Sequence, residues 1–247
     1  MIKMIKIIKS SEFEKDCIVQ KTITSTTMTS SVAMIIANVI KRGDEALREY
    51  TERFDGCTLS SFELPKDAMD KALKNIDPDF IKTMERAAIN IEKFHRNQIQ
   101  KGFDLPPDNG VILGQKVIPI ERVGVYVPGG SASYPSSVLM NCIPAKIAGV
   151  SEIIIATPPS PNCNIKCEDD VCKVDGVTCV NGIDARVIAA AKIAGADRVF
   201  TIGGAQAIAA LAFGTDSIPR VDKITGPGNA YVAEAKRQVF GDRKSHV

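Results

Sequence analysis

Aromatic residues are scarce in this chain of 247 residues. They make up 5% of the composition, and tryptophan is absent. Proteins that hold single-stranded nucleic acid stack its bases on aromatic side chains, so the composition argues against that mode of binding. The net charge is only +2 and no basic stripe is present. The sequence therefore indicates no nucleic-acid partner.

Long apolar runs are also missing. No stretch of 18 apolar residues occurs, so we expect no membrane-spanning helix. The first residues, MIKMIKIIKSSEFEKD, lack a separate apolar segment and a small-residue cleavage site. We interpret them as a first strand or a docked arm. Apolar residues make up 45% of the chain, which is enough for a substantial core.

Familiar catalytic motifs are absent as well. The chain contains no G-x-G-x-x-G, H-E-x-x-H, G-x-S-x-G or Walker A sequence. Its two histidines are His95 and His246. His95 lies beside the apolar stripe of a helical pattern, which favours a packing role, and His246 is next to the last residue. The residues alone therefore identify no catalytic group and no metal ligand.

Cysteine is more frequent than histidine in this chain, with seven copies. Three are isolated, namely Cys17, Cys57 and Cys142, and four form a cluster, namely Cys163, Cys167, Cys172 and Cys179. The odd number of cysteines favours a protein of the reducing cytoplasm over one held by a disulfide framework. No CxxC pair or nearby histidine supports a standard zinc site. We interpret the cluster as part of a loop insertion, and a redox-sensitive pair or a metal site remains an alternative.

The first hundred residues are typical of helices. Residues 30–56 show helical apolar spacing and end at Gly56, with Gly43 indicating either a bend or a break between two helices. A second amphipathic helix is predicted over DPDFIKTMERAAINIEKFHRNQ. The expected inward stripe of this helix is Phe80, Met84, Ala87, Ala88, Ile91 and Phe94. Residues 1–118 are therefore expected to form a mostly helical first part.

The pattern changes after KGFDLPPDNG. QKVIPIERVGVYVP predicts two short strands or one bent edge strand. Short apolar strands at 123–127, 152–156, 198–202 and 221–224 then alternate with helices at 136–148, 184–194, 205–213 and 230–240. This order predicts an α/β fold with a parallel sheet covered on both faces. We expect this unit to occupy 119–241, with an insertion at 160–182 and a short tail at 242–247.

Glycine-rich turns follow three of these strands. They read PGGSASYP, GGAQAIAAL and TGPGNAYVAEA. In a parallel sheet such turns share the carboxyl edge, where ligands bind, and helix N-termini there attract phosphate. Tyr126, Gln206 and Asn229 lie in or beside the turns, which predicts a nucleotide or dinucleotide site. Tyr126 as a packed strand residue and Asn229 as a helix N-cap are the structural alternatives.

These blocks, together with RGDEALREYTERFDG, resemble histidinol dehydrogenases. The resemblance implies a Rossmann-like sheet in an incomplete, aldehyde-dehydrogenase-like architecture. It also implies a homodimer that oxidises L-histidinol to L-histidine in histidine biosynthesis, with two NAD+ and zinc. Tyr126, Gln206 and Asn229 match the family's NAD contacts.

In that family the zinc ligands, a proton-handling Glu-His pair and the substrate-binding residues follow the segment that matches this chain. We therefore expect a chain that lacks those groups and whose early helices expose apolar faces. The alternatives are a degenerate or non-catalytic NAD-binding fragment and a related polyol or sulfodiol dehydrogenase.

Overall fold

A four-stranded parallel sheet forms the centre of the protein in a computed structural model, which describes residues 26–129, 133–160, 171–174 and 176–241. The expected first strand or arm and the expected tail lie outside these ranges. The strands are β3 (Arg122–Tyr126), β4 (Glu152–Thr157), β8 (Arg198–Thr201) and β9 (Lys223–Thr225), in the spatial order β8-β4-β3-β9. All neighbouring pairs are parallel.

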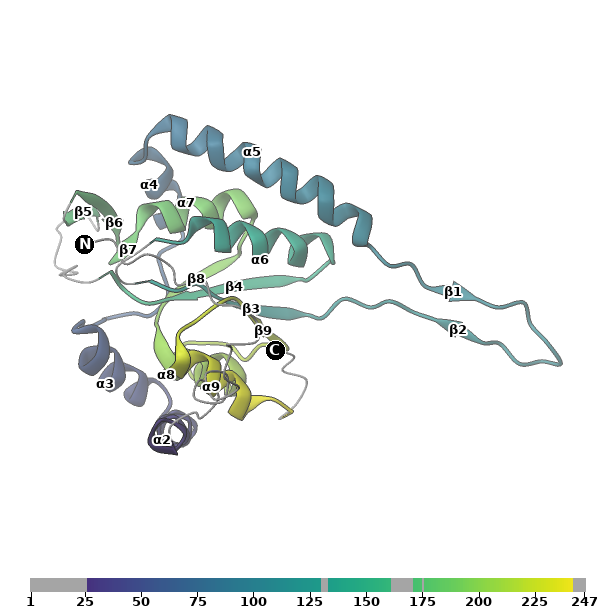
Figure 1. The fold of residues 1–247 in the computed structure, drawn as a ribbon, viewed down its shortest axis with the longest axis horizontal. Coiled ribbons are helices and arrows are strands. Elements are labelled where there is room, and N and C mark those ends of the chain that lie inside the picture. The colour runs from purple at the N-terminus through teal and green to yellow at the C-terminus, as the bar shows by residue number, and fades with distance from the viewer. Residues whose placement is uncertain (1–25, 130–132, 161–170, 175, 242–247) are drawn as a thin grey trace, which may run out of the picture.

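Four helices connect or follow these strands (Figure 1). They are α6 (Pro135–Ile147), α7 (Ala185–Ala194), α8 (Gly204–Phe213) and α9 (Ala230–Val239). The chain moves outward from β3 through β4 to β8, and then returns across the sheet to form β9 on the other side of β3. The direction of winding therefore reverses between β3 and β9, which is where open α/β sheets bind ligands. The predicted α/β fold is confirmed, and these elements begin and end within two residues of the predicted positions.

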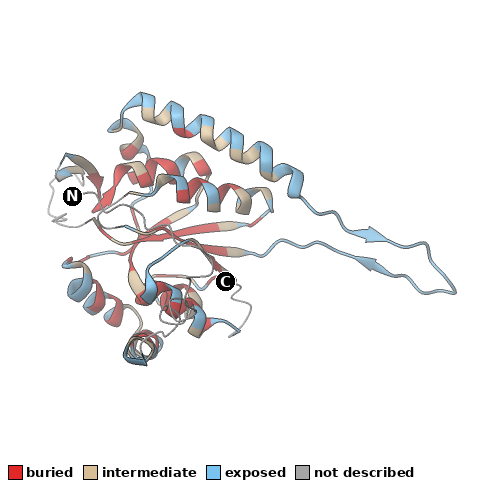
Figure 2. Ribbon diagram, in the orientation of Figure 1, coloured by how far each residue is buried: buried red, intermediate tan, exposed pale blue. Residues whose placement is uncertain are grey.

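Alternating residues along the strands pack into two separate cores. Val125 and Ile155 point into a core formed with α6 and α7, whereas Tyr126 and Ile154 point into a core formed with α8 and α9. Both faces are covered, so the strands are buried almost along their whole length (Figure 2). This explains why they appear in the sequence as short apolar runs.

The N-terminal helices complete both layers. They are α2 (Thr26–Arg42), α3 (Asp44–Asp55), α4 (Ala68–Lys74) and α5 (Pro78–His95), followed by the 3-10 helix η2 (Arg96–Gln98). The α2–α3 pair packs on the face that carries α8 and α9, and α4 and α5 pack on the face that carries α6 and α7. Gly43, with φ of 52°, separates α2 from α3, so the two-helix interpretation is confirmed.

The apolar stripe of α5 is only partly covered. Met84 is buried and most of the predicted stripe packs against the core. Phe94 is an exception, because it is 64% exposed, so its predicted inward position is wrong. His95 is half-buried, and its Nδ1 lies 2.6 Å from Oε1 of Gln98, in agreement with a packing role.

Large apolar side chains remain exposed on the early helices, as expected. Met34 is 64% exposed, Ile40 56% and Ile89 64%. None of the helices in the described ranges combines the length and apolarity needed to cross a bilayer.

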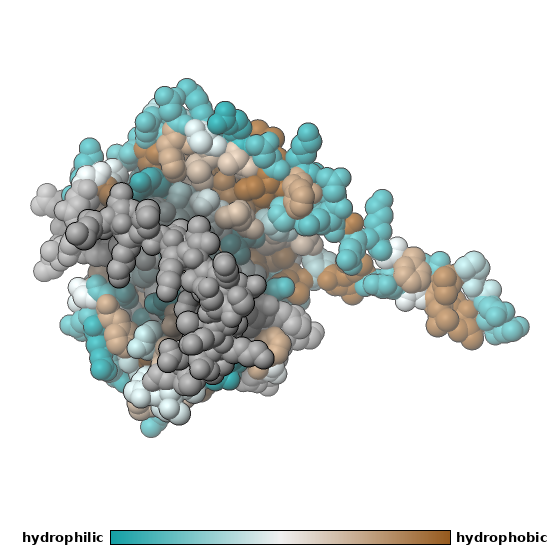
Figure 3. Space-filling model, in the orientation of Figure 1, coloured by the Kyte–Doolittle hydropathy of each residue, from teal (hydrophilic) through white to brown (hydrophobic). Residues whose placement is uncertain are grey.

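A long hairpin projects from the body between α5 and β3 (Figure 1). Its strands, β1 (Phe103–Asp104) and β2 (Gly114–Gln115), pair antiparallel, and Asn109 and Gly110 at its tip have positive φ. Every residue from 96 to 121 is exposed, including several large apolar ones, and Figure 3 shows brown side chains along this arm. The stretch QKVIPIERVGVYVP contains the end of β2 and all of β3, so it holds two strands, but the pairing of β2 with β1 was not predicted. The edge-strand alternative is wrong because β3 lies between β4 and β9.

A second hairpin occupies the end of the expected insertion. It consists of β5 (Val171–Val174), β6 (Val177–Val180) and β7 (Ile183–Asp184), which form an antiparallel sheet. The prediction of a plain loop is therefore wrong for this part. Cys163 and Cys167 lie outside the described residues. Cys57 and Cys142 are buried and neither forms a disulfide, and Cys17 again lies outside the described ranges.

Candidate functional site

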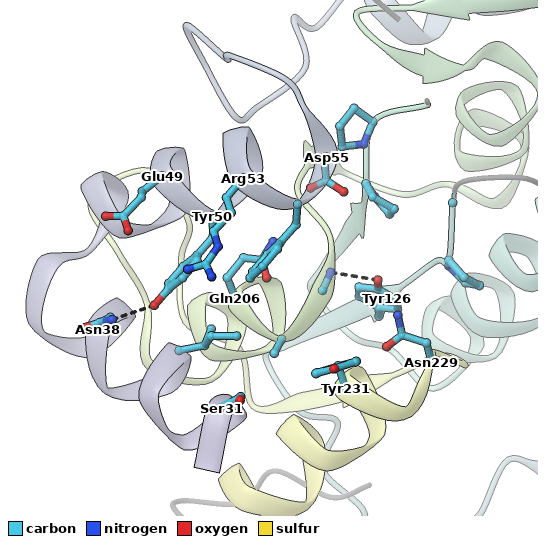
Figure 4. Close-up of a pocket in the computed structure, with 18 of the residues that line it drawn as sticks. Ser31, Asn38, Glu49, Tyr50, Arg53, Asp55, Tyr126, Gln206, Asn229 and Tyr231 are labelled. Atoms are coloured by element: carbon cyan, nitrogen blue, oxygen red, sulfur yellow. Dashed lines mark hydrogen bonds between the residues drawn. The ribbon is translucent and has the colours of Figure 1, made fainter. Parts of the chain in front are cut away.

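A cavity of about 870 Å³ opens at the carboxyl ends of β3 and β9. Its walls come from the turns that follow β3 and β4, from the starts of α8 and α9, and from α2 and α3 (Figure 4). Tyr126, Gln206 and Asn229 all line it. The structure thus brings together the three residues selected from the sequence, at the point where the strand order reverses.

Tyr126 is the last residue of β3 and is 4% exposed. Its hydroxyl oxygen accepts a hydrogen bond of 3.1 Å from the backbone N–H of Gly204, in the first turn of α8. Burial raises the pKa of Tyr126, and the nearby charge of Asp55 acts in the same direction. The phenol therefore stays neutral at pH 7 and keeps its own proton for a hydrogen bond to a ligand.

Gln206 lies in the first turn of α8 and is 1% exposed. Within the part of the chain that the structure describes, neither Oε1 nor Nε2 has a hydrogen-bond partner. An unpaired buried amide costs about 1–3 kcal/mol, so natural proteins rarely retain one without a partner. Because Gln206 borders the cavity, a molecule in that cavity is the natural partner for its amide.

Asn229 is exposed and forms the N-cap of α9, where its Oδ1 accepts a hydrogen bond of 3.0 Å from the N–H of Val232. The capping interpretation is therefore confirmed. The cap uses the side-chain oxygen, and the amide –NH₂ group carries two further donors. Asn229 can hold the helix start and offer a donor to the cavity at the same time.

The turn before α9 requires glycine at position 226. Gly226 has a φ of 99°, and a Cβ built there would lie 1.9 Å from the carbonyl oxygen of Tyr126. Nζ of the buried Lys236 donates a hydrogen bond of 2.5 Å to the carbonyl of Gly226, and burial lowers the pKa of this lysine. The ends of β3 and β9 are thus held in direct contact beneath the cavity.

Two early helices supply a wall that sequence reasoning missed. Asn38 of α2 donates a hydrogen bond of 2.7 Å to the hydroxyl of Tyr50 in α3, and both line the cavity with Arg53 and Asp55 (Figure 4). Asp55 is the last residue of α3, where the helix dipole disfavours a negative charge. The sequence signal that could have indicated this wall is the carboxylate of Asp55 at the C-terminal end of a predicted helix.

Asp55 is the most perturbed acid bordering the cavity. Burial raises its pKa to about 6, and its Oδ2 has no hydrogen-bond partner among the described residues. Its negative charge also raises the pKa of Cys57, although burial of that thiol is the larger cause. Asp55 can therefore change protonation near neutral pH, at the edge of the cavity.

The cavity offers no obvious metal site. In residues 26–129, 133–160, 171–174 and 176–241, no group of three or more His, Cys, Asp and Glu side chains is placed to hold a metal ion. His95 is not among the cavity residues. The arrangement suits a bound nucleotide more than hydrolytic chemistry, because its distinctive features are helix starts, amides and a phenol.

Comparisons with known proteins agree on one family. The family model described as histidinol dehydrogenase matches residues 19–246. A histidinol dehydrogenase from Lactiplantibacillus plantarum is 50% identical over 212 residues, which cover 86% of this chain and 45% of the relative. One from Oceanobacillus iheyensis is 47% identical over 221 residues, covering 90% and 48%.

A solved structure gives the same result. The crystal structure of histidinol dehydrogenase from Elizabethkingia anophelis matches with a TM-score of 0.77 and 32% identity, covering 90% of this chain and 47% of that one. The chain thus spans about half the length of the relatives it matches. The match of the family model to nearly the whole sequence shows that the chain belongs to the histidinol dehydrogenase family.

Proposed function

We propose that the cavity binds NAD+ and that this chain supplies the nucleotide-binding part of an enzyme that oxidises L-histidinol to L-histidine. Membership of the family supports the reaction class. The position of the cavity, at the reversal of strand order, supports a dinucleotide. The observation that carries the proposal is the buried Gln206 amide, which borders the cavity with both polar atoms unpaired.

The residues present fit such a ligand. The N-termini of α8 and α9 both border the cavity, and their free N–H groups favour the pyrophosphate. Tyr126 and Asn229 add a hydroxyl and an amide that bond ribose or phosphate oxygens. Bound NAD+ would supply the hydride acceptor for alcohol oxidation. We propose that 119–241 carry this unit and that helices within 1–118 close its cavity.

Among the described residues, no group of side chains is placed to bind the zinc that the family uses. We therefore assign no step to a metal and no catalytic role to a residue of this chain. On this basis we expect the chain to bind NAD+ without forming NADH from L-histidinol. Formation of NADH would show that the chain contains a complete catalytic set that the described residues do not reveal.

The projecting arm supports a further part of the proposal. Ile112 is 74% exposed and Ile118 is 77% exposed, on a two-stranded hairpin that has little stability of its own in water. We propose that a second copy of the chain covers this arm in a homodimer, because contiguous exposed apolar surface marks interaction sites. The odd number of cysteines supports the cytoplasm as the compartment.

Isothermal titration of the purified chain with NAD+ tests the proposal. Gln206→Met keeps the size of the side chain but removes both polar atoms, so we expect binding about 10–100-fold weaker, in line with the loss of one or two hydrogen bonds. Gln100→Met makes the same change at an exposed position and should leave the affinity unchanged. Failure of the wild-type chain to bind, or equal binding by Gln206→Met, would contradict the proposal.

A further inference from the structure

Two cysteines face each other across the β5–β6 hairpin. The strand register pairs Cys172 directly with Cys179. Opposite residues on antiparallel strands project from the same face, and their Cα atoms lie about 4.5–5.5 Å apart. A disulfide needs Cα atoms about 4.4–6.8 Å apart. The backbone of the hairpin thus already has the spacing that a disulfide requires.

The two thiols differ in their access to solvent. Cys179 is 1% exposed, whereas Cys172 is half-buried, and neither forms a disulfide in the structure. Oxidants in solution therefore reach Cys172 more readily than Cys179. This is the usual arrangement of an accessible cysteine with a neighbouring resolving cysteine.

The surroundings of Cys179 favour thiol chemistry over metal binding. Asp184 lies opposite Cys179 on β7, but its two carboxylate oxygens accept hydrogen bonds of 2.6–3.1 Å from the guanidinium of Arg186. These hydrogen bonds raise the pKa of the Arg186 guanidinium. Arg186 thus engages the carboxylate that could otherwise share a metal ion with Cys179.

We propose that Cys172 and Cys179 form a reversible disulfide when the protein meets a peroxide. The Cys172 thiolate attacks one oxygen of hydrogen peroxide; it becomes a sulfenic acid, and the hydroxide that leaves takes up the thiol proton to form water. The Cys179 thiol then attacks the Cys172 sulfur, the S–S bond forms, and the sulfenic oxygen leaves as a second water. In total, two thiols and one peroxide give one disulfide and two waters. A dithiol reductant reverses the step by exchange.

The position of the hairpin gives this bond a structural consequence. The backbone N–H of Ser160 donates a hydrogen bond of 2.7 Å to the carbonyl of Gly182, at the turn between β6 and β7. Pro158 and Pro159, directly before Ser160, line the cavity. A disulfide within the hairpin would therefore fix a segment that is attached to the rim of the cavity.

Peptide mapping of the wild-type chain tests the proposal. The reduced protein, in the presence of EDTA, is treated with hydrogen peroxide, alkylated without reduction and digested with trypsin. Lys173 separates the two cysteines, so a Cys172–Cys179 bond joins the peptides CEDDVCK (167–173) and VDGVTCVNGIDAR (174–186). We expect this linked pair, two hydrogens lighter than its parts, and its loss after dithiothreitol.

Cysteine variants identify the partner within the first peptide, because it also contains Cys167. The link should disappear in Cys172→Ser and in Cys179→Ser, and it should persist in Cys167→Ser. A link that disappears in Cys167→Ser, or a wild-type chain whose Cys172 and Cys179 are both alkylated after peroxide, would overturn the proposal. The wild-type map does not depend on the folding of any variant.

Discussion

Asp55 should make the protein less stable at neutral pH than at mildly acidic pH. Its pKa is about 6 in the folded protein, against 3.8 for an ordinary aspartate, and burial is the cause. An acid with a raised folded pKa binds more protons folded than unfolded between these values. The stability therefore falls as the pH rises through this window. Two units of pKa correspond to about 3 kcal/mol, so the ionised carboxylate costs about 2–3 kcal/mol at pH 7.5.

Asp55→Asn removes this ionisation and keeps the shape of the side chain. We expect it to raise the free energy of unfolding by about 2–3 kcal/mol at pH 7.5 and to change it by less than about 1 kcal/mol at pH 4, where both side chains are neutral in the folded protein. Urea unfolding at pH 4, 5, 6 and 7.5 measures the difference. Asp216→Asn, at an exposed position, is the control and should have little effect at any of these pH values. A gain of the same size at pH 4 and 7.5, or no gain at all, would refute the reasoning.

Three further predictions concern the turn, the cap and the arm. Gly226→Ala should destabilise the chain by about 2–4 kcal/mol in urea unfolding through strain and a backbone clash. Gly56→Ala has a similar positive φ but open space around it, and should cost only about 1 kcal/mol. Asn229→Asp should keep the helix cap and the stability but weaken NAD+ binding in a titration through repulsion of phosphate, whereas Asn229→Ala should lose about 1 kcal/mol of stability as well. Light scattering should detect a dimer for the wild type and a monomer for the double variant Ile112→Asp/Ile118→Asp, and a dimer that survives the double variant would exclude the arm as its interface.

The elements of the sheet could be read from the sequence because burial on both faces leaves a clear mark. Strands such as β4, with the run Glu152–Thr157, are short and apolar, and the helices between them have regular spacing. Tyr126, Gln206 and Asn229 could be selected because parallel strands bring their following turns to one edge. That choice needed only the order of the strands and no knowledge of side-chain packing.

The wall formed by α2 and α3 could not be read in this way. Its position depends on contacts between distant parts of the chain, such as the hydrogen bond between Asp44 and Ser217, which are 173 residues apart. The two hairpins were missed for a different reason. Each has strands of only two to four residues, but Asn109-Gly110 and Asp175-Gly176 are turn pairs that could have revealed them.

Phe94 shows the limit of periodicity as evidence. Its spacing along α5 matches the stripe that contains Met84, yet it is 64% exposed because it belongs to the last turn of that helix. A helical pattern indicates which residues share a face, but only tertiary contacts decide how far along the helix that face is covered. The same exposed turn leads into the projecting arm.

A crystal structure of the chain grown with NAD+ tests the central claim most directly. We predict a dinucleotide at the carboxyl ends of β3 and β9, with the Gln206 amide within hydrogen-bond distance and the pyrophosphate facing the start of α8 or α9. A dinucleotide bound elsewhere, or a cavity that stays free of it at concentrations far above the measured Kd, would contradict the account.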